Sequence, residues 1–335
     1  MRAILLEQPG DPAQLQLREV PEPAAPTGTQ LRIRLHAAGI NPLDTKLRAR
    51  GTYYPEQMPT ILGCDGAGVI ESIGPDVALY QIGDRVMFFN GGIGGHGVDQ
   101  GNYADYTLVD AAHVAHIPDT IDFIQAAAAP LACITAWESL FDRVQLKSTD
   151  TILIHAGAGG VGHIAIQLAR NIGARVITTI GDESRRDFVR TMGAECVINY
   201  REDDFVKTAL AETNGRGVDV CLDTVGGKTF ERSFACTKVY GDIVTLLQPD
   251  ADTDWKTARI RNLRTTQELM LTPMVLNLSD ARHHQGEILS RCAALMATGA
   301  LEIEVAATYP LEQAADAHRR IEAGGMQGKL VLTLS

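Results

Sequence analysis

A glycine-rich run, Gly157-Ala158-Gly159-Gly160-Val161-Gly162, has the residue types and spacing that most clearly indicate a chemical function. It follows an apolar strand-like stretch and opens a helix-like stretch, and three of its glycines fit the G-x-G-x-x-G spacing. Such a turn points several backbone N–H groups at one place, where the helix dipole adds positive charge. The run predicts a site for a dinucleotide pyrophosphate. The alternative is a tight turn with nothing bound.

The elements around this turn alternate between strand and helix. Strands are expected at 151–155, 175–180, 196–199, 218–223 and 241–247, and helices at 160–172, 183–192, 203–213 and 227–236. Strands separated by helices of this length indicate a parallel, doubly wound sheet, so the fold class is α/β.

The first 120 residues have a different pattern. Short alternating stretches at 31–36, 68–74, 84–89 and 103–109 read as strands, with Gly and Pro between them. They predict a small, irregular β-barrel. An Ala-rich helix interrupted at Pro130 is expected at 124–140, and helices at 287–297 and 313–322 with a last strand at 329–333 are assigned to the first domain.

Composition excludes several classes of protein. The net charge of −11 argues against a general nucleic-acid or anionic-membrane surface, and no apolar run reaches the length of a membrane span. The six cysteines are scattered singly with no C-x-x-C pair, which argues against a disulfide framework and favours a reducing cytoplasm.

Several segments carry a family resemblance. They are 38–44, 62–70, 83–86, 101–106, the glycine turn, 197–203, 317–320 and 328–332. In this order and spacing the chain resembles the zinc-independent branch of the medium-chain dehydrogenase/reductase superfamily, the quinone oxidoreductase group that includes zeta-crystallin. The resemblance implies a GroES-like β-barrel catalytic domain at 1–121 and 275–335, a Rossmann cofactor domain at 122–274, and an active-site cleft between them.

The same resemblance argues against zinc. In the alcohol dehydrogenase branch a catalytic zinc takes two ligands from the barrel and one from the entry to the cofactor domain. Asn41, Cys64 and Leu131 occupy those three positions here, and 88–110 lacks the cysteines of the structural zinc lobe. We therefore expect no metal site.

For the cofactor, the resemblance favours NADPH over NADH. Ile180 ends the second strand, where NAD enzymes place a carboxylate for the ribose. Arg185 aligns with a basic residue that holds the 2′-phosphate in NADPH-specific relatives, and Tyr200 matches a second residue on the phosphate side. A solvated helix start is the alternative for Arg185, and Asp182 turning towards a ribose would keep NAD open.

Without a metal, hydride transfer to a quinone or an α,β-unsaturated carbonyl is the expected chemistry, because these acceptors spread negative charge onto a conjugated oxygen. By resemblance the catalytic candidates are Asn41 and one of Tyr53 and Tyr54. Asp44, which lies close to Asn41 in sequence, is a further candidate that would orient water or a neighbouring group. Asn41 as a plain turn residue before Pro42 is the alternative.

The resemblance also assigns Thr135 and Lys329 to the cofactor, and a helix hydroxyl bonded to its own backbone is the alternative for Thr135. Reduction of enoyl-thioesters or 2-alkenals, and a non-catalytic NADPH-binding role in structure or sensing, are the other functions considered. The apolar stretch 268–275 lies where relatives extend the Rossmann sheet across a dimer interface. A homodimer is expected, with a buried edge strand inside one chain as the alternative.

Overall fold

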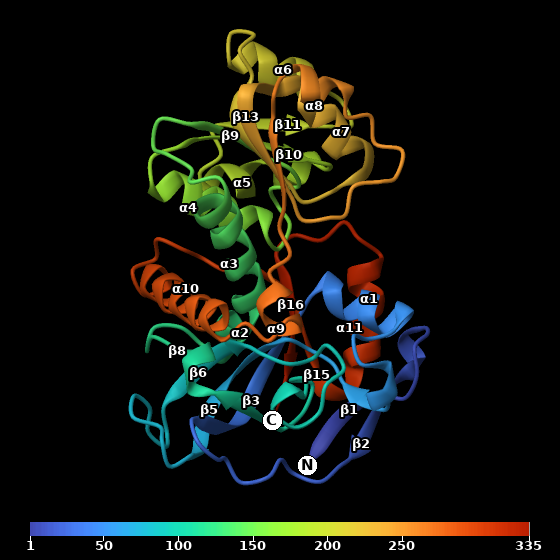
Figure 1. Cartoon of the computed structure of the whole chain (residues 1–335), viewed down its shortest axis with the longest axis vertical. Helices are drawn as coiled ribbons and strands as arrows, with labels where there is room; N and C mark the ends of the chain where they lie inside the picture. Colours follow the sequence, from blue (N-terminus) through green and yellow to red (C-terminus); the bar gives the residue numbers. More distant parts are fainter. Residues whose placement is uncertain (335) are drawn as a thin grey trace. The chain divides into compact units, whose positions relative to one another are not determined.

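The computed structural model of the chain describes residues 1–334. The chain forms two compact units, one made of residues 1–131 together with the chain from 271 onward, the other of residues 132–270. Each unit is built on its own sheet system (Figure 1). Within the described residues, every helix falls short of the length and apolar character that a membrane span requires.

The second unit contains a six-stranded, all-parallel sheet in the order β11-β10-β9-β12-β13-β14. Its strands are β9 (Thr151–Ile154), β10 (Arg175–Ile180), β11 (Cys196–Asn199), β12 (Val218–Asp223), β13 (Thr237–Thr245) and β14 (Arg264–Gln267). Chain order reverses between β9 and β12, which is the arrangement of a dinucleotide-binding sheet. The predicted doubly wound fold is therefore confirmed, and the predicted strands at 175–180, 196–199 and 218–223 have the observed bounds.

Helices connect these strands in two packed groups. They are α4 (Gly162–Asn171) and α5 (Arg186–Met192) in one group, and α6 (Phe205–Glu212), α7 (Gly227–Cys236) and α8 (Lys256–Ile260) in the other. The second group buries Phe205, Phe230 and Phe234 against alternate residues of the sheet, such as Leu153 and Ile177. The first turn of the expected helix 183–192 is a 3₁₀ turn, Glu183–Arg185.

The first unit is mainly antiparallel. One sheet has the order β15-β16-β3-β5-β6-β8 with β7 paired to β3, and a smaller sheet has the order β2-β1-β4. The strands are β1 (Arg2–Leu6), β2 (Leu15–Glu19), β3 (Gln30–Ile40), β4 (Thr60–Ile61), β5 (Asp65–Ile73), β6 (Arg85–Phe89), β7 (Tyr106–Asp110), β8 (Val114–His116), β15 (Val305–Pro310) and β16 (Lys329–Thr333). The helices are α1 (Pro42–Arg50), α2 (Phe123–Ala128), α9 (Thr272–Val275), α10 (Ser279–Ala297) and α11 (Ala314–Glu322).

The predicted boundary at 121/122 stays a prediction, while the compact units change over at 131/132 and 270/271. Helix α2 packs on β3 and β5 of the first unit. The contact is close, since a Cβ on Gly39 of β3 would lie 2.2 Å from the carbonyl oxygen of Ala127. Helix α3 (Pro130–Trp137) then runs into the second unit and continues as a π-helix, Glu138–Arg143.

The structure differs from the sequence expectations at two places. The helix expected at 287–297 begins eight residues earlier, at Ser279, because its polar first turns are held by contacts rather than by apolar periodicity. Gly286, for example, lies so close to the backbone of Ala112 that a Cβ would be 2.2 Å from the Ala112 carbonyl oxygen. The stretch 268–275 is not a strand: the sheet ends at β14 (Arg264–Gln267), and residues 272–275 form the short helix α9.

Candidate functional site

The glycine turn lies between β9 and α4, as expected. A Cβ on Gly157 would be 2.0 Å from Thr178 Oγ1, and one on Gly162 would be 2.3 Å from the Ala156 carbonyl oxygen. Neighbouring atoms of the protein therefore exclude a side chain at both positions. Gly159 differs, because the nearest atom to an added Cβ is 3.2 Å away. The glycine at 159 is thus needed less for packing than for the approach of something outside the chain.

Four backbone amides of this turn are free. Gly157 N–H donates to the Thr179 carbonyl at 3.0 Å and Gly159 N–H to the Ala156 carbonyl at 2.9 Å. Within residues 1–334, the remaining turn amides have no hydrogen-bond acceptor; they belong to Ala158, Gly160, Val161 and Gly162. Free N–H groups at the start of a ten-residue helix form a site for a phosphate group.

Arg185 and Arg186 have different surroundings. The guanidinium of Arg186 donates to both carboxylate oxygens of Glu183 and, at 2.7 Å, to the carbonyl of Val197. Arg185 is half-buried and, among the described residues, its guanidinium has no hydrogen-bond partner. Of the two, Arg185 is therefore the residue available to an anion.

Sequence reasoning missed a second cation near Arg185, which is Arg201. The carboxylate of Asp182 accepts hydrogen bonds from the backbone N–H and the hydroxyl of Ser184, which lower its pKa. The positive charges of Arg185 and Arg201 lower this pKa further, so both arginines lie near Asp182. Arg201 directly follows Tyr200, whose hydroxyl lies against Gly181 closely enough that a Cβ there would be 2.4 Å away. Arg185, Tyr200 and Arg201 thus surround the loop that follows β10. Ile180 ends β10, so the strand carries no carboxylate at its end, as the sequence indicated.

Three polar residues of the first unit come together at one end of its sheet. In the strand pairing, Leu330 of β16 is opposite Ile40 of β3, and Gly39 of β3 is opposite Asp65 of β5. This register places Lys329, Asn41 and Asp65 side by side. The Asn41 amide donates from Nδ2 to Asp65 Oδ2 at 2.9 Å, and its Oδ1 accepts from the Lys329 ammonium.

Asp44, in the first turn of α1, extends this cluster. Its Oδ2 accepts the backbone N–H of Asn41 at 2.7 Å and the hydroxyl of Tyr103 at 3.0 Å, while its buried Oδ1 has no partner among the described residues. Tyr103 in turn lies 3.3 Å from Nε2 of His318. Sequence reasoning missed Asp65, Tyr103 and His318. Asp65 is a carboxylate at the start of an apolar strand, and this pattern could have indicated it from the sequence. No local sequence pattern connects Tyr103 with His318.

Burial dominates the titration of Asp44. Removal from water raises the pKa of its carboxyl to about 7, and the nearby charge of Asp65 adds to the rise, although the hydrogen bonds from Asn41 and Tyr103 oppose it. A carboxyl that binds its proton more tightly in the folded chain favours folding at low pH. That contribution is lost as pH rises from the ordinary value of 3.8 towards about 7.

Within the described residues, Tyr53 and Tyr54 stay separate from this cluster in hydrogen bonding. The Tyr53 side chain is 43% exposed and Tyr54 is half-buried, and neither hydroxyl has a partner in the described part of the chain. The contacts do not distinguish the two tyrosines. Thr135 is buried on α3. Lys329 is committed to Asn41 and, at 3.7 Å, to Asp65, so its assignment to the cofactor stays a prediction.

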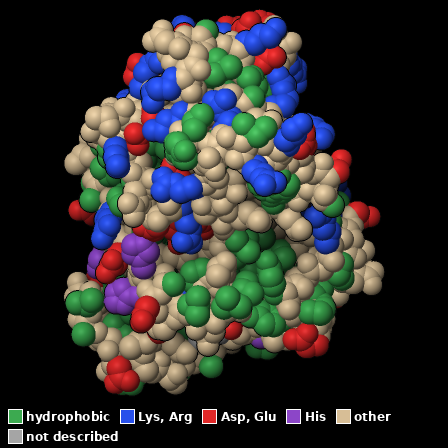
Figure 2. Space-filling view, turned by 45° about the horizontal axis from the view of Figure 1, so that its top comes forward, with side chains coloured by type: hydrophobic (Ala, Val, Ile, Leu, Met, Phe, Trp, Pro, Cys, Tyr) green, Lys and Arg blue, Asp and Glu red, His purple; other side chains and the backbone are tan. Residues whose placement is uncertain are grey.

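The positions where relatives bind zinc have little capacity for a metal. Burial raises the pKa of the Cys64 thiol well above its ordinary range, which keeps the sulfur protonated. Figure 2 shows His side chains gathered on one part of the surface. Within residues 1–334, no three His, Cys, Asp or Glu side chains are arranged to hold a metal ion. The lack of zinc remains a prediction.

Known proteins resemble this chain over its whole length. Family models of the alcohol dehydrogenase GroES-like domain and the zinc-binding dehydrogenase match residues 27–119 and 192–332. Quinone oxidoreductase 1 of Escherichia coli is 33% identical over 326 residues, covering 96% of each chain. The crystal structure of E. coli quinone oxidoreductase complexed with NADPH has a TM-score of 0.86 at 30% identity and covers 100% of both chains.

A part of a larger protein is equally similar. A phenolphthiocerol/phthiocerol polyketide synthase subunit of Mycobacterium tuberculosis is 32% identical over 330 residues, which are 98% of this chain and 14% of that protein.

A GroES-like unit joined to a doubly wound parallel sheet with a glycine turn after its first strand is the architecture of a medium-chain dehydrogenase/reductase. The chain belongs to the quinone oxidoreductase group of that superfamily. It is therefore an oxidoreductase, and the fold and family that the sequence predicted are confirmed.

Proposed function

We propose that this oxidoreductase uses NADPH to transfer a hydride to a quinone or an α,β-unsaturated carbonyl compound, without a catalytic metal. The observation that carries the proposal is the set of free groups in the second unit: four turn amides and the unpartnered guanidinium of Arg185. The E. coli relative crystallised with NADPH supports the same cofactor.

The residues present fit NADPH. The amides of residues 158 and 160–162 would hold the pyrophosphate, and Gly159 leaves room for it. Arg185, Arg201 and Tyr200 would hold the 2′-phosphate, since two guanidinium groups suit a dianion and Ile180 places no carboxylate against it. Thr135 and Lys329 stay proposed cofactor residues. When bound, NADPH supplies the hydride.

In the first unit, Asn41 and Asp44 are proposed to act on the acceptor oxygen. One Nδ2 hydrogen of Asn41 is committed to Asp65 and the other is available to a carbonyl oxygen. The Lys329 ammonium draws electron density from the Asn41 oxygen, which strengthens the amide as a donor. With its pKa raised to about 7, Asp44 is partly protonated near neutral pH and can give up a proton. One of Tyr53 and Tyr54 is proposed to face the acceptor.

The residues at the zinc positions support the proposal of a metal-free reaction. Asn41 is engaged by Lys329 and Asp65, Cys64 is a neutral buried thiol, and Leu131 has no ligand atom in its side chain. Quinones and conjugated carbonyls suit such a site, because the charge that follows hydride addition is delocalised in the acceptor.

A second candidate function is reduction of an enoyl-thioester or a 2-alkenal. It is favoured by the 32% identity to part of a polyketide synthase. Both functions use the same cofactor, so the acceptor distinguishes them.

The test is a panel of acceptors that includes quinones, enones, 2-alkenals and enoyl-thioesters, assayed by oxidation of NADPH with NADH in parallel. Turnover is expected with NADPH and at least one quinone or enone. Turnover confined to enoyl-thioesters would favour the second function. Tight NADPH binding with no turnover on any acceptor would favour a structural or sensing role.

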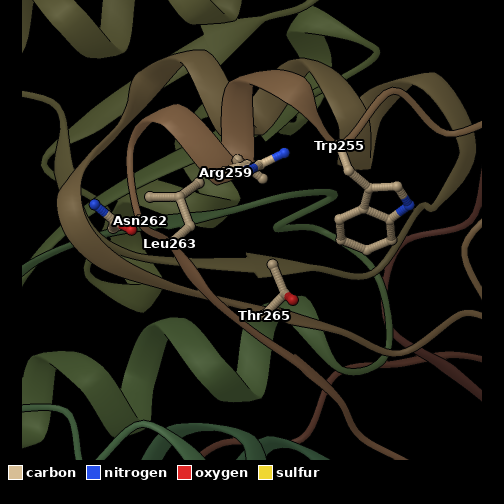
Figure 3. A pocket seen from close by; sticks show the side chains of 6 residues that line it. Trp255, Arg259, Asn262, Leu263 and Thr265 are labelled. Atoms are coloured by element: carbon tan, nitrogen blue, oxygen red, sulfur yellow. The ribbon is translucent and has the colours of Figure 1, made fainter.

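A homodimer and a cytoplasmic location are also proposed. Strand β14 is an edge of the sheet in the described chain, and nearby Val239, Tyr240 and Ile260 are 49%, 70% and 70% exposed. Beside this edge, Trp255, Ala258, Arg259, Asn262, Leu263 and Thr265 line a pocket of about 300 Å³ (Figure 3). An edge strand with one unpaired side and apolar neighbours suits pairing with a second copy of the chain. Light scattering tests this, and a monomer would remove the dimer.

A further inference from the structure

The buried histidine at the start of the glycine turn has partners from three other elements. His155, which is 1% exposed, directly follows β9. Its Nδ1 lies 3.2 Å from Thr179 Oγ1 of β10, and its Nε2 lies 2.9 Å from Ser233 Oγ of α7. The ring packs edge-on against Phe205 of α6, with the centroids 4.8 Å apart. The side chain thus connects the turn to the neighbouring strand β10 and to the helix layer that contains α6 and α7.

One direction gives every hydrogen in this chain of contacts an acceptor among the described residues. Thr179 Oγ1 accepts the Ala156 N–H at 3.0 Å, so its own hydrogen is available to Nδ1 of His155. At the other end, Ser233 donates its hydrogen to the Thr229 carbonyl at 2.7 Å, so its oxygen accepts from Nε2 of His155. The imidazole is therefore neutral and carries its hydrogen on Nε2.

The acid–base environment agrees with a neutral ring. Burial is the largest influence and lowers the pKa of His155 to about 4. The negative charge of Asp223 and the positive charge of Arg232 act on the ring in opposite directions.

Ala156, at the end of this chain of hydrogen bonds, has an unusual backbone. Its φ of 51° lies in the left-handed region, which costs energy for a residue with a Cβ. Thr179 fixes both amides of this segment, since its hydroxyl accepts from Ala156 and its carbonyl accepts from Gly157 at 3.0 Å. The Ala156 carbonyl then accepts the Gly159 N–H, which closes the turn. The direction in which the four free N–H groups point therefore depends on how the Thr179 hydroxyl is held.

We propose that His155 is a positioning residue for the phosphate-binding turn, acting through Thr179 and anchored by Ser233 on α7. The proposal rests on the proposed function, because the ligand it serves is the pyrophosphate of the nicotinamide cofactor. NADPH and NADH share that group. Loss of the contact therefore weakens both cofactors equally, unlike loss of a 2′-phosphate contact.

The test compares two buried hydroxyls of the same region. Ser233→Ala removes the acceptor of the His155 Nε2–H without touching the turn. Thr237→Val is the matched control, because the Thr237 hydroxyl also donates to an α7 carbonyl, that of Ser233 at 2.9 Å, but does not contact His155. We expect Ser233→Ala to raise the Kd values of NADPH and NADH alike by about three- to tenfold, the effect of one buried hydrogen bond.

The increase should fall on KM for NADPH rather than on kcat, and Thr237→Val should leave both Kd values within about twofold of wild type. Folded Ser233→Ala protein with wild-type Kd values would overturn the proposal. So would equal weakening in the control. A wild-type chain that binds neither nucleotide would instead remove the proposed function itself.

A second measurement does not depend on the variants folding. In wild-type protein with ¹⁵N-labelled histidine, the imidazole shifts of His155, assigned from a His155→Gln spectrum, report which nitrogen carries the hydrogen. The Nε2–H form at neutral pH supports the proposal. An Nδ1–H form or an imidazolium would contradict it, because Thr179 could then no longer donate to the ring.

Discussion

Replacing Arg185 by Ala should weaken NADPH far more than NADH. Its guanidinium is half-buried and unpartnered within the described chain, so it is free to meet the 2′-phosphate that only NADPH carries. The variant removes this one cation and leaves the turn amides in place. It therefore separates recognition of the 2′-phosphate from recognition of the pyrophosphate.

The magnitude follows from the contact and its exposure. Hydrogen bonds to charged groups contribute about 1.5–3 kcal/mol. Because Arg185 is only half-buried, solvent screening favours the lower limit, and Arg201 can retain part of the attraction. We therefore expect the Kd of NADPH to rise about tenfold, while that of NADH changes by less than about twofold.

The assay is a titration of each cofactor by fluorescence or calorimetry, at two salt concentrations. Arg186→Ala is the control, because that guanidinium is already bonded to Glu183 and the Val197 carbonyl. It should lower thermal stability and affect both cofactors by the same small factor. Equal losses of NADPH and NADH affinity in Arg185→Ala would refute the phosphate role of Arg185.

Three further results are expected. Gly159→Ala should fold but lose NADPH affinity, because its Cβ would lie 3.2 Å from the Ala156 carbonyl oxygen, a tight contact that a small shift relieves. Gly162→Ala should reduce stability, because its Cβ would lie 2.3 Å from the same oxygen, and equal melting temperatures would contradict this contrast. Asp44→Asn should gain free energy of unfolding relative to wild type as pH rises towards about 7, by up to about 4 kcal/mol, and a pH-independent difference in denaturant titrations would reject the raised pKa of Asp44. Metal analysis should find less than stoichiometric zinc, and chelation should leave turnover unchanged; activity that needs one zinc per chain would overturn the interpretation of Asn41 and Cys64.

Local pattern was sufficient for the parallel sheet. Strand and helix periods alternate cleanly from residue 151, so β10, β11, β12 and α7 have the bounds that the sequence predicts. Pattern failed where contacts, rather than periodicity, decide the structure. The first turns of α10 are polar and close-packed, and the apolar stretch at 268–275 does not extend the sheet.

The candidate site was predictable only in part, for a related reason. Asn41 and Lys329 were found by resemblance and Asp44 by its closeness to Asn41 in sequence, but their joint environment depends on the register of β16, β3 and β5. The contact of Tyr103 with His318 joins residues 215 positions apart, a separation at which a single sequence carries no signal. Likewise, the Arg186 guanidinium has hydrogen-bond partners and that of Arg185 has none among the described residues, a difference that depends on how the turn folds.

Calorimetric titration of the purified wild-type chain with NADPH and NADH tests the central claim most directly. The free amides of the glycine turn and the free Arg185 predict one NADPH site per chain, with NADPH bound more tightly than NADH. Absence of measurable affinity for either nucleotide would contradict the account.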